Sequence, residues 1–174
     1  MALRRMCSIV MLAGTMLGAS VATSVAAKDV LVTSGLPVPR YVSLKSDHVN
    51  VRAGPTKDND VAWVYTRSGL PVEITAEFEN WRRVRDSEGA EGWVYHSLLS
   101  GRRTAVITMK NKDDLASLYE RADAASAVSA RLQAGVVAQV KHCASGWCHV
   151  AGNGFDGWIE QQRLWGVYAD EKVE

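Results

Sequence analysis

An internal repeat constrains the fold of this chain more than any other feature of the sequence. Both copies contain a glycine, a tryptophan about a dozen positions later, and a Gly-Trp dipeptide after that: Gly69, Trp81 and Gly92-Trp93 in the first, and Gly135, Trp147 and Gly157-Trp158 in the second. Self-similarity at a fixed spacing indicates two copies of one structural unit. We place a first module at residues 41–103 and a second module at 104–168, each of about 60 residues.

Short β-strands are the local signal within each module. Segments rich in β-branched and aromatic residues are separated by Gly, Pro, Asp and Asn, and in the first module they lie at residues 49–51, 61–66, 72–75, 81–85 and 93–95. Five short strands are too few for a two-sheet sandwich, but they can close into a small barrel. The only helical signals are single turns at 112–118 and 161–164. The sequence therefore predicts an all-β fold of two tandem small barrels.

The N-terminal segment has the pattern of a cleaved signal peptide. Arg4 and Arg5 precede an uncharged, apolar run, and small residues at 25–27 provide a cleavage site before Lys28. The alternative is a membrane anchor, but Gly, Ser and Thr interrupt the run, and its strongly apolar part is short for a spanning helix. We therefore expect residues 1–27 to be removed and the chain to be periplasmic or secreted, without a stable membrane anchor. Residues 28–40 would be a linker and 169–174 a tail.

Two cysteines remain after removal of the signal peptide, and we expect them to form a disulfide. Cys143 and Cys148 flank a Ser-Gly turn that would bring the strands of a hairpin together. Exported chains fold in an oxidising environment, where such pairs are oxidised. The alternative is a metal site completed by His142 and His149, although four ligands within one short hairpin match no usual spacing of structural zinc sites.

The first module resembles bacterial SH3 domains. Its opening, Val49-Asn-Val-Arg-Ala-Gly-Pro55, is similar to the signature of that family, and Asn80-Trp81 and Gly92-Trp93-Val94 continue the family's order. The second module, with Cys-x-x-Gly-Trp-Cys and a closing Leu-Trp-Gly, is similar to a two-module group of exported SH3-like proteins. It departs from the pattern at 118–122, so we describe it as degenerate. The resemblance covers residues 41–168.

This resemblance implies SH3-like barrels and a binding role without catalysis. Many such modules attach cell-wall hydrolases to peptidoglycan, so peptidoglycan stem peptides are the expected ligand. The alternative is a periplasmic interaction module that recruits an exported partner through an extended peptide segment. Fold does not fix function, so both readings rest on analogy.

Composition and motifs argue against several other classes of function. Lys and Arg number 20 against 19 Asp and Glu, so the chain lacks the basic excess of a nucleic-acid-binding protein. It contains no Gly-x-Ser-x-Gly, His-Glu-x-x-His or glycine-rich phosphate loop. We therefore expect no enzyme activity, no catalytic residues, no cofactor and no bound metal.

Strand alternation predicts a ligand-binding surface on the first module. With Val84, Val94 and Val64 directed to the core, the alternate positions share the outer face. An extended peptide or glycan would stack on the aromatic rings of that face, and the arginines there would bind carboxylates of the ligand. The alternative is that the rings bury against the second module or cover the barrel ends. The candidate ligand-binding residues are Trp81, Arg83, Arg85, Trp93, Tyr95, Trp63 and Tyr65.

Overall fold

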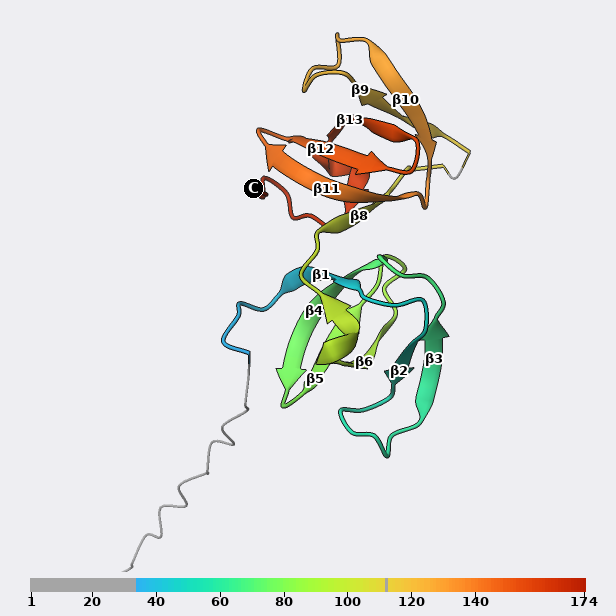
Figure 1. The fold of residues 1–174 in the computed structure, drawn as a ribbon, viewed down its shortest axis with the longest axis vertical. Coiled ribbons are helices and arrows are strands. Elements are labelled where there is room, and N and C mark those ends of the chain that lie inside the picture. The colour runs from blue at the N-terminus through green and yellow to red at the C-terminus, as the bar shows by residue number, and fades with distance from the viewer. Residues whose placement is uncertain (1–33, 112) are drawn as a thin grey trace, which may run out of the picture. The chain divides into compact units, whose positions relative to one another are not determined.

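A computed structural model describes residues 34–111 and 113–174 (Figure 1). The predicted signal peptide at 1–27 and the predicted linker up to residue 33 lie outside the described residues. Among the residues that are described, no helix is long and apolar enough to cross a membrane.

The first module folds as one seven-stranded antiparallel sheet with strand order β3-β2-β6-β5-β4-β1-β7 (Figure 1). A short 3-10 helix, η1 (His96–Leu98), connects the last two strands of this module. The strands are β1 (Arg40–Leu44), β2 (Val49–Arg52), β3 (Val61–Tyr65), β4 (Pro71–Phe78), β5 (Trp81–Arg85), β6 (Glu91–Tyr95) and β7 (Leu99–Ser100).

The second module repeats this topology strand for strand. Its sheet has the order β10-β9-β13-β12-β11-β8-β14, so each strand corresponds to the one seven places earlier in the chain. The internal repeat and the all-β fold of two SH3-like modules are therefore confirmed. The elements are β8 (Thr104–Ile107), β9 (Leu115–Tyr119), β10 (Val128–Gln133), β11 (Val137–Ala144), β12 (Trp147–Gly152), β13 (Phe155–Glu160), η2 (Gln161–Arg163) and β14 (Leu164–Trp165).

All five strands predicted for the first module are present as β2 to β6, whereas β1 and β7 were not predicted. The helical turn predicted at 161–164 is present as η2. The turn predicted at 112–118 is wrong, because Leu115–Tyr119 forms strand β9. Ala116 and Leu118 alternate inward along that strand and are buried, so the strand period, not the helical one, places them in the core.

The core of the first module consists of aliphatic side chains directed inward from β1, β2, β4, β5 and β6. Val84 and Val94 have no exposed surface, as the alternation predicted. Gly92 lies next to Val94 on the inner side, where a Cβ atom would meet the Val51 side chain and the Trp63 ring. A glycine is thus required at this position because two core side chains occupy the space. The buried cluster is Leu44, Val49, Val51, Val72, Ile74, Val84 and Val94.

The core of the second module contains the predicted disulfide. Cys143 in β11 and Cys148 in β12 are directly opposite each other in the hairpin, are bonded with an S–S distance of 2.02 Å, and are fully buried. The bond uses both sulfur atoms that the alternative metal site requires, so that alternative is wrong. Val173, in the segment expected to be a tail, is buried against this hairpin and pairs with Cys143 through backbone hydrogen bonds.

A buried carboxylate fixes the chain that enters β1. The Glu77 side chain is 1% exposed and accepts hydrogen bonds from the Ser34 backbone N–H at 2.6 Å and the Ser34 hydroxyl at 2.7 Å. The guanidinium groups of Arg40 and Arg82 pair with the same carboxylate. Burial alone would raise the pKa of Glu77, but the hydrogen bonds from Ser34 and Arg40 outweigh it and lower the pKa to about 2.

Candidate functional site

The outer face of strands β5 and β6 carries part of the predicted surface. Arg83 and Arg85 are exposed and alternate with buried Val84, as expected. Trp93 lies directly opposite Arg83, and Tyr95 lies opposite Trp81, so these side chains share one face of the sheet. Trp93 and Tyr95 are both half-buried.

Trp81 is on this face but is not exposed, which corrects the sequence-based expectation. Trp81 is the register partner of Phe78 in β4 and of Tyr95 in β6. The Trp81 and Tyr95 rings meet edge to face, with 5.4 Å between their centroids. Only 8% of Trp81 is exposed.

Trp63 and Tyr65 do not belong to this face, so their predicted placement is wrong. In strand β3 they lie opposite Val51 and Val49, which are core residues, and both rings pack against the core. The Tyr65 hydroxyl donates a hydrogen bond to Asp86 at 2.9 Å. Burial, followed by this hydrogen bond, raises the pKa of Tyr65. These two rings therefore complete the core of the module.

The two exposed arginines are already paired with carboxylates of the same module. Arg83 contacts Glu91 in β6, with 2.6 Å between Nη2 and Oε2. Arg85 directs both Nε and Nη2 at Oε2 of buried Glu73 in β4, with 3.0 Å from Nε. The hydrogen bonds to Glu73 raise the pKa of Arg85. A ligand carboxylate would have to compete with Glu91 or Glu73 for these guanidinium groups.

A small pocket next to Trp81 and Tyr95 is lined by two other cationic side chains, Arg52 and Lys57. It has a volume of about 160 Å³, and its six lining residues are Asn50, Arg52, Lys57, Trp81, Tyr95 and Leu98. Arg52 donates to the backbone carbonyl of Asn59 at 2.6 Å. Within residues 34–111 and 113–174, neither Arg52 nor Lys57 forms an ion pair. The pocket thus combines two cations with two aromatic rings, and the sequence analysis missed both cations.

Arg52 and Lys57 had a signal that the sequence analysis did not use. Arg52 ends β2 within the family-like opening Val49–Pro55, and Lys57 lies in the loop that follows this strand. The strand register then places Arg52 directly opposite Trp93. The end of β2 and the loop that follows it thus contribute the positive charge that was expected from β5.

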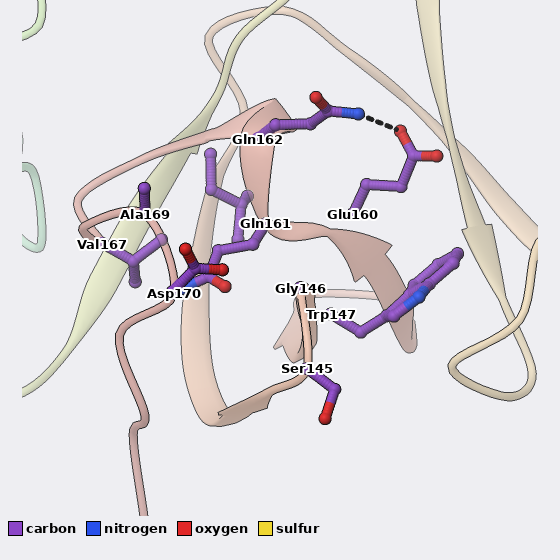
Figure 2. A pocket seen from close by; sticks show the side chains of 10 residues that line it. Ser145, Gly146, Trp147, Glu160, Gln161, Gln162, Val167, Ala169 and Asp170 are labelled. Atoms are coloured by element: carbon purple, nitrogen blue, oxygen red, sulfur yellow. Dashed lines mark hydrogen bonds between the residues drawn. The ribbon is translucent and has the colours of Figure 1, made fainter.

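The second module has a pocket at the corresponding tryptophan (Figure 2). Its volume is about 460 Å³, and Trp147 at the start of β12 and Glu160 at the end of β13 contribute to its wall. Glu160 accepts a hydrogen bond from Gln162 Nε2 at 3.2 Å, drawn in Figure 2. The full lining is Ser145, Gly146, Trp147, Glu160, Gln161, Gln162, Leu164, Val167, Ala169 and Asp170.

The two histidines of the second module pack on one tryptophan. The His149 ring stacks on Trp158 with 5.1 Å between centroids, and Nε2 of His149 lies 2.7 Å from Oδ1 of Asp156. His142 approaches the same indole edge to face at 6.1 Å. Among the described residues there is no group of three or more His, Cys, Asp or Glu side chains suited to a metal ion.

Two solved structures that this chain resembles are distant in sequence. NlpC2 from Trichomonas vaginalis is 14% identical with a TM-score of 0.33, over 75% of this chain and 49% of that one. NlpC1 from the same organism is also 14% identical with a TM-score of 0.33, over 76% of this chain and 47% of that one. The chain thus spans about half the length of these proteins. A comparison with curated proteins finds no match.

The family comparison agrees with the two modules. The bacterial SH3 domain family matches residues 45–101 and 112–166. The first region covers strands β2 to β7, and the second covers β9 to β14. Both matches fall on the repeated topology, and together they cover more than half of the sequence. This chain belongs to the bacterial SH3 domain family.

Proposed function

We propose that this protein is an exported, non-catalytic binding protein that attaches to peptidoglycan by holding a carboxylate of the stem peptides in its first module. The observation that carries the proposal is the pocket at Arg52, Lys57, Trp81 and Tyr95, where two cations that form no ion pair with any described residue adjoin two aromatic rings. Arginine forms paired hydrogen bonds with carboxylates, and tryptophan and tyrosine provide contact area at low entropic cost.

The size of the pocket supports a small group as its occupant. Sites for whole small molecules usually have volumes of roughly 300–1,000 Å³, whereas this pocket has about 160 Å³. A carboxylate with the adjoining part of one amino acid suits that volume better than a disaccharide does. The rest of an extended peptide would then lie across the open surface beyond the pocket.

Export is supported by the buried disulfide in the second module and by the family. Disulfides persist in oxidising compartments and are rare in the cytosol, and Cys143 and Cys148 are bonded. Bacterial SH3 domains also act at the cell wall in many proteins, which agrees with a periplasmic or secreted location. The proposed signal peptide at 1–27 would direct this export.

Co-sedimentation with purified peptidoglycan sacculi tests the proposal. We expect the chain beginning at Lys28 to sediment with intact sacculi and to stay in solution with glycan strands from which an amidase has removed the stem peptides. Arg52→Gln with Lys57→Gln should reduce the bound fraction at least tenfold. The matched control is Arg83→Gln with Arg85→Gln, which removes the same charge from paired residues and should reduce binding much less.

Two results would refute the proposal. Equal binding to stripped glycan strands would make the glycan the ligand. Absence of binding to intact sacculi, with an exported protein captured instead, would favour the recruitment of a protein partner.

A further inference from the structure

An open pocket of about 500 Å³ is lined by residues of both modules, and we call it the inter-module pocket. Its lining is Arg67, Ser68, Gly69, Arg102, Thr104, Val137, Gln139, Lys141, Ala151 and Gly152. The two modules belong to one compact unit of the chain. Within it, the buried hydroxyl of Thr104 in β8 donates to the carbonyl of Gly69, before β4, at 2.8 Å. This bond joins the modules at the pocket.

The inter-module pocket collects positive charge from three separate segments of the chain. Arg67 lies in the loop between β3 and β4, Arg102 between β7 and β8, and Lys141 in β11. The lining contains no acidic residue. Within residues 34–111 and 113–174, none of these three cations forms an ion pair. Like charges repel one another, so an anion bound among them would lower the electrostatic energy of the pocket.

The guanidinium groups of the two arginines lie against the backbone. A Cβ atom on Gly69 would lie 3.2 Å from Nη2 of Arg102, so the Arg102 guanidinium lies directly over this glycine. Nη1 of Arg67 is 3.4 Å from the carbonyl oxygen of Gly135 in the second module, which is a long contact for a hydrogen bond. Arginine has five N–H donors and no acceptor. Most of the donors of both arginines therefore remain for a ligand.

The polar groups on β11 add further donors to the same pocket. Lys141 Nζ donates a hydrogen bond to Oε1 of Gln139 at 3.0 Å. This bond engages the oxygen of the amide, so Gln139 offers its nitrogen with two N–H donors. Lys141 has two more donors on its ammonium group. The inter-module pocket thus presents positive charge and N–H donors, and the ligand that complements it is an anion with several acceptor oxygens.

We propose that the inter-module pocket binds a soluble phosphate monoester. Such a group carries a charge of about −1.5 to −2 at neutral pH and three acceptor oxygens, so it complements three cations better than one carboxylate does. The volume of about 500 Å³ lies within the range of roughly 300–1,000 Å³ that is usual for whole small molecules. Val137 and Ala151 are the only apolar side chains in the lining, which suits a hydroxylated organic part and not an acyl chain. The inference does not depend on the ligand of the first module.

Titration of glucose 1-phosphate into the chain beginning at Lys28, followed by two-dimensional NMR, tests this site. The probe should shift the backbone amides of Gly69 and Gln139 and the Nε–H resonance of Arg102. Glucuronate, a sugar with a single carboxylate, should bind at least tenfold more weakly. Potassium chloride at the same ionic strength measures the effect of screening alone and should not produce these shifts.

The variants separate the site from general charge effects. Arg67→Gln with Arg102→Gln should weaken binding of glucose 1-phosphate at least tenfold in a protein whose spectrum shows an intact fold. Arg121→Gln with Arg131→Gln removes the same charge from exposed arginines outside the pocket and should leave binding unchanged.

Four results would overturn the proposal. Glucuronate or chloride could reproduce the shifts, the first double variant could bind like the parent, or both double variants could lose binding equally. Attachment to vesicles that contain phosphatidic acid, without binding of glucose 1-phosphate, would make a membrane lipid the ligand.

Discussion

The rings of Trp81 and Tyr95 meet edge to face across neighbouring strands, at an interplanar angle of 84°. This contact gives Trp81 two roles. The indole is buried as part of the module's packing, and it also lines the pocket that contains Arg52 and Lys57. Aromatic pairs of this geometry contribute about 0.5–1.5 kcal/mol beyond the area they bury.

Truncation of Trp81 should therefore destabilise the first module. Trp81→Ala removes a buried indole and leaves a cavity, and it should lower the free energy of unfolding by about 3–5 kcal/mol. Trp93→Ala, at a half-buried ring on the same face, should cost clearly less. Hydrogen exchange of backbone amides in β4, β5 and β6 measures both effects in the full mature chain. Equal protection in the two variants would mean that Trp81 is not a packing residue.

The Glu77 carboxylate should make the first module sensitive to acid. Its pKa is about 2 in the folded chain, against an ordinary value of 4.5. Because the folded value is the lower one, ionised Glu77 stabilises the fold fully above about pH 4.5, and this stabilisation is lost as the pH falls towards 2. The difference corresponds to on the order of 3 kcal/mol.

Unfolding measured from pH 2 to pH 7 tests this account. Glu77→Gln should lower stability at neutral pH and flatten the decline on the acid side, and Ser34→Ala should produce a smaller change in the same direction. Glu79→Gln, two residues further on at an exposed position of the turn, is the matched control. An acid decline that remains unchanged in Glu77→Gln would assign it to other carboxylates.

The disulfide should contribute modestly to the second module. Cys143 and Cys148 are five positions apart, so the closed loop is short and the bond restricts the unfolded chain by about 2 kcal/mol. Replacement of both cysteines by alanine should lower stability by this amount, and a reductant should lower the parent by a similar amount. A reductant that further destabilises the double variant would show that its effect does not act through this bond.

Much of the fold could be predicted from the sequence because strands and repeats have local signals. Valines at alternate positions of β2, and Val84 and Val94 within β5 and β6, identified the inward face correctly. Strand β1 was missed because its first residues are not strongly apolar and its partner, β4, is distant in the chain. The Gly92-Trp93 pattern was recognised, but its cause, the Val51 and Trp63 side chains over Gly92, depends on tertiary packing.

The candidate site was predicted less well. Strand alternation shows which residues lie on the same face of a strand, but it shows neither which face is the core nor which side chains each residue contacts. Trp63 and Tyr65 do share a face, but only the register with Val51 and Val49 shows that this face is the core. Arg83 and Arg85 are exposed as predicted, yet pairing with Glu91 and Glu73 across the sheet occupies their guanidinium groups. The family-like opening draws attention to Arg52 and Lys57, but only the folded structure brings them beside Trp81 and Tyr95.

Titration of a stem peptide into the mature chain tests the central claim most directly. The peptide is used with a free C-terminal carboxylate and as the C-terminal amide, and binding is measured by calorimetry. We predict that the amide binds at least tenfold more weakly to the parent, and that this difference disappears in Arg52→Gln with Lys57→Gln but persists in Arg83→Gln with Arg85→Gln. Equal affinity for the two peptides, or a difference that persists without Arg52 and Lys57, would contradict the account.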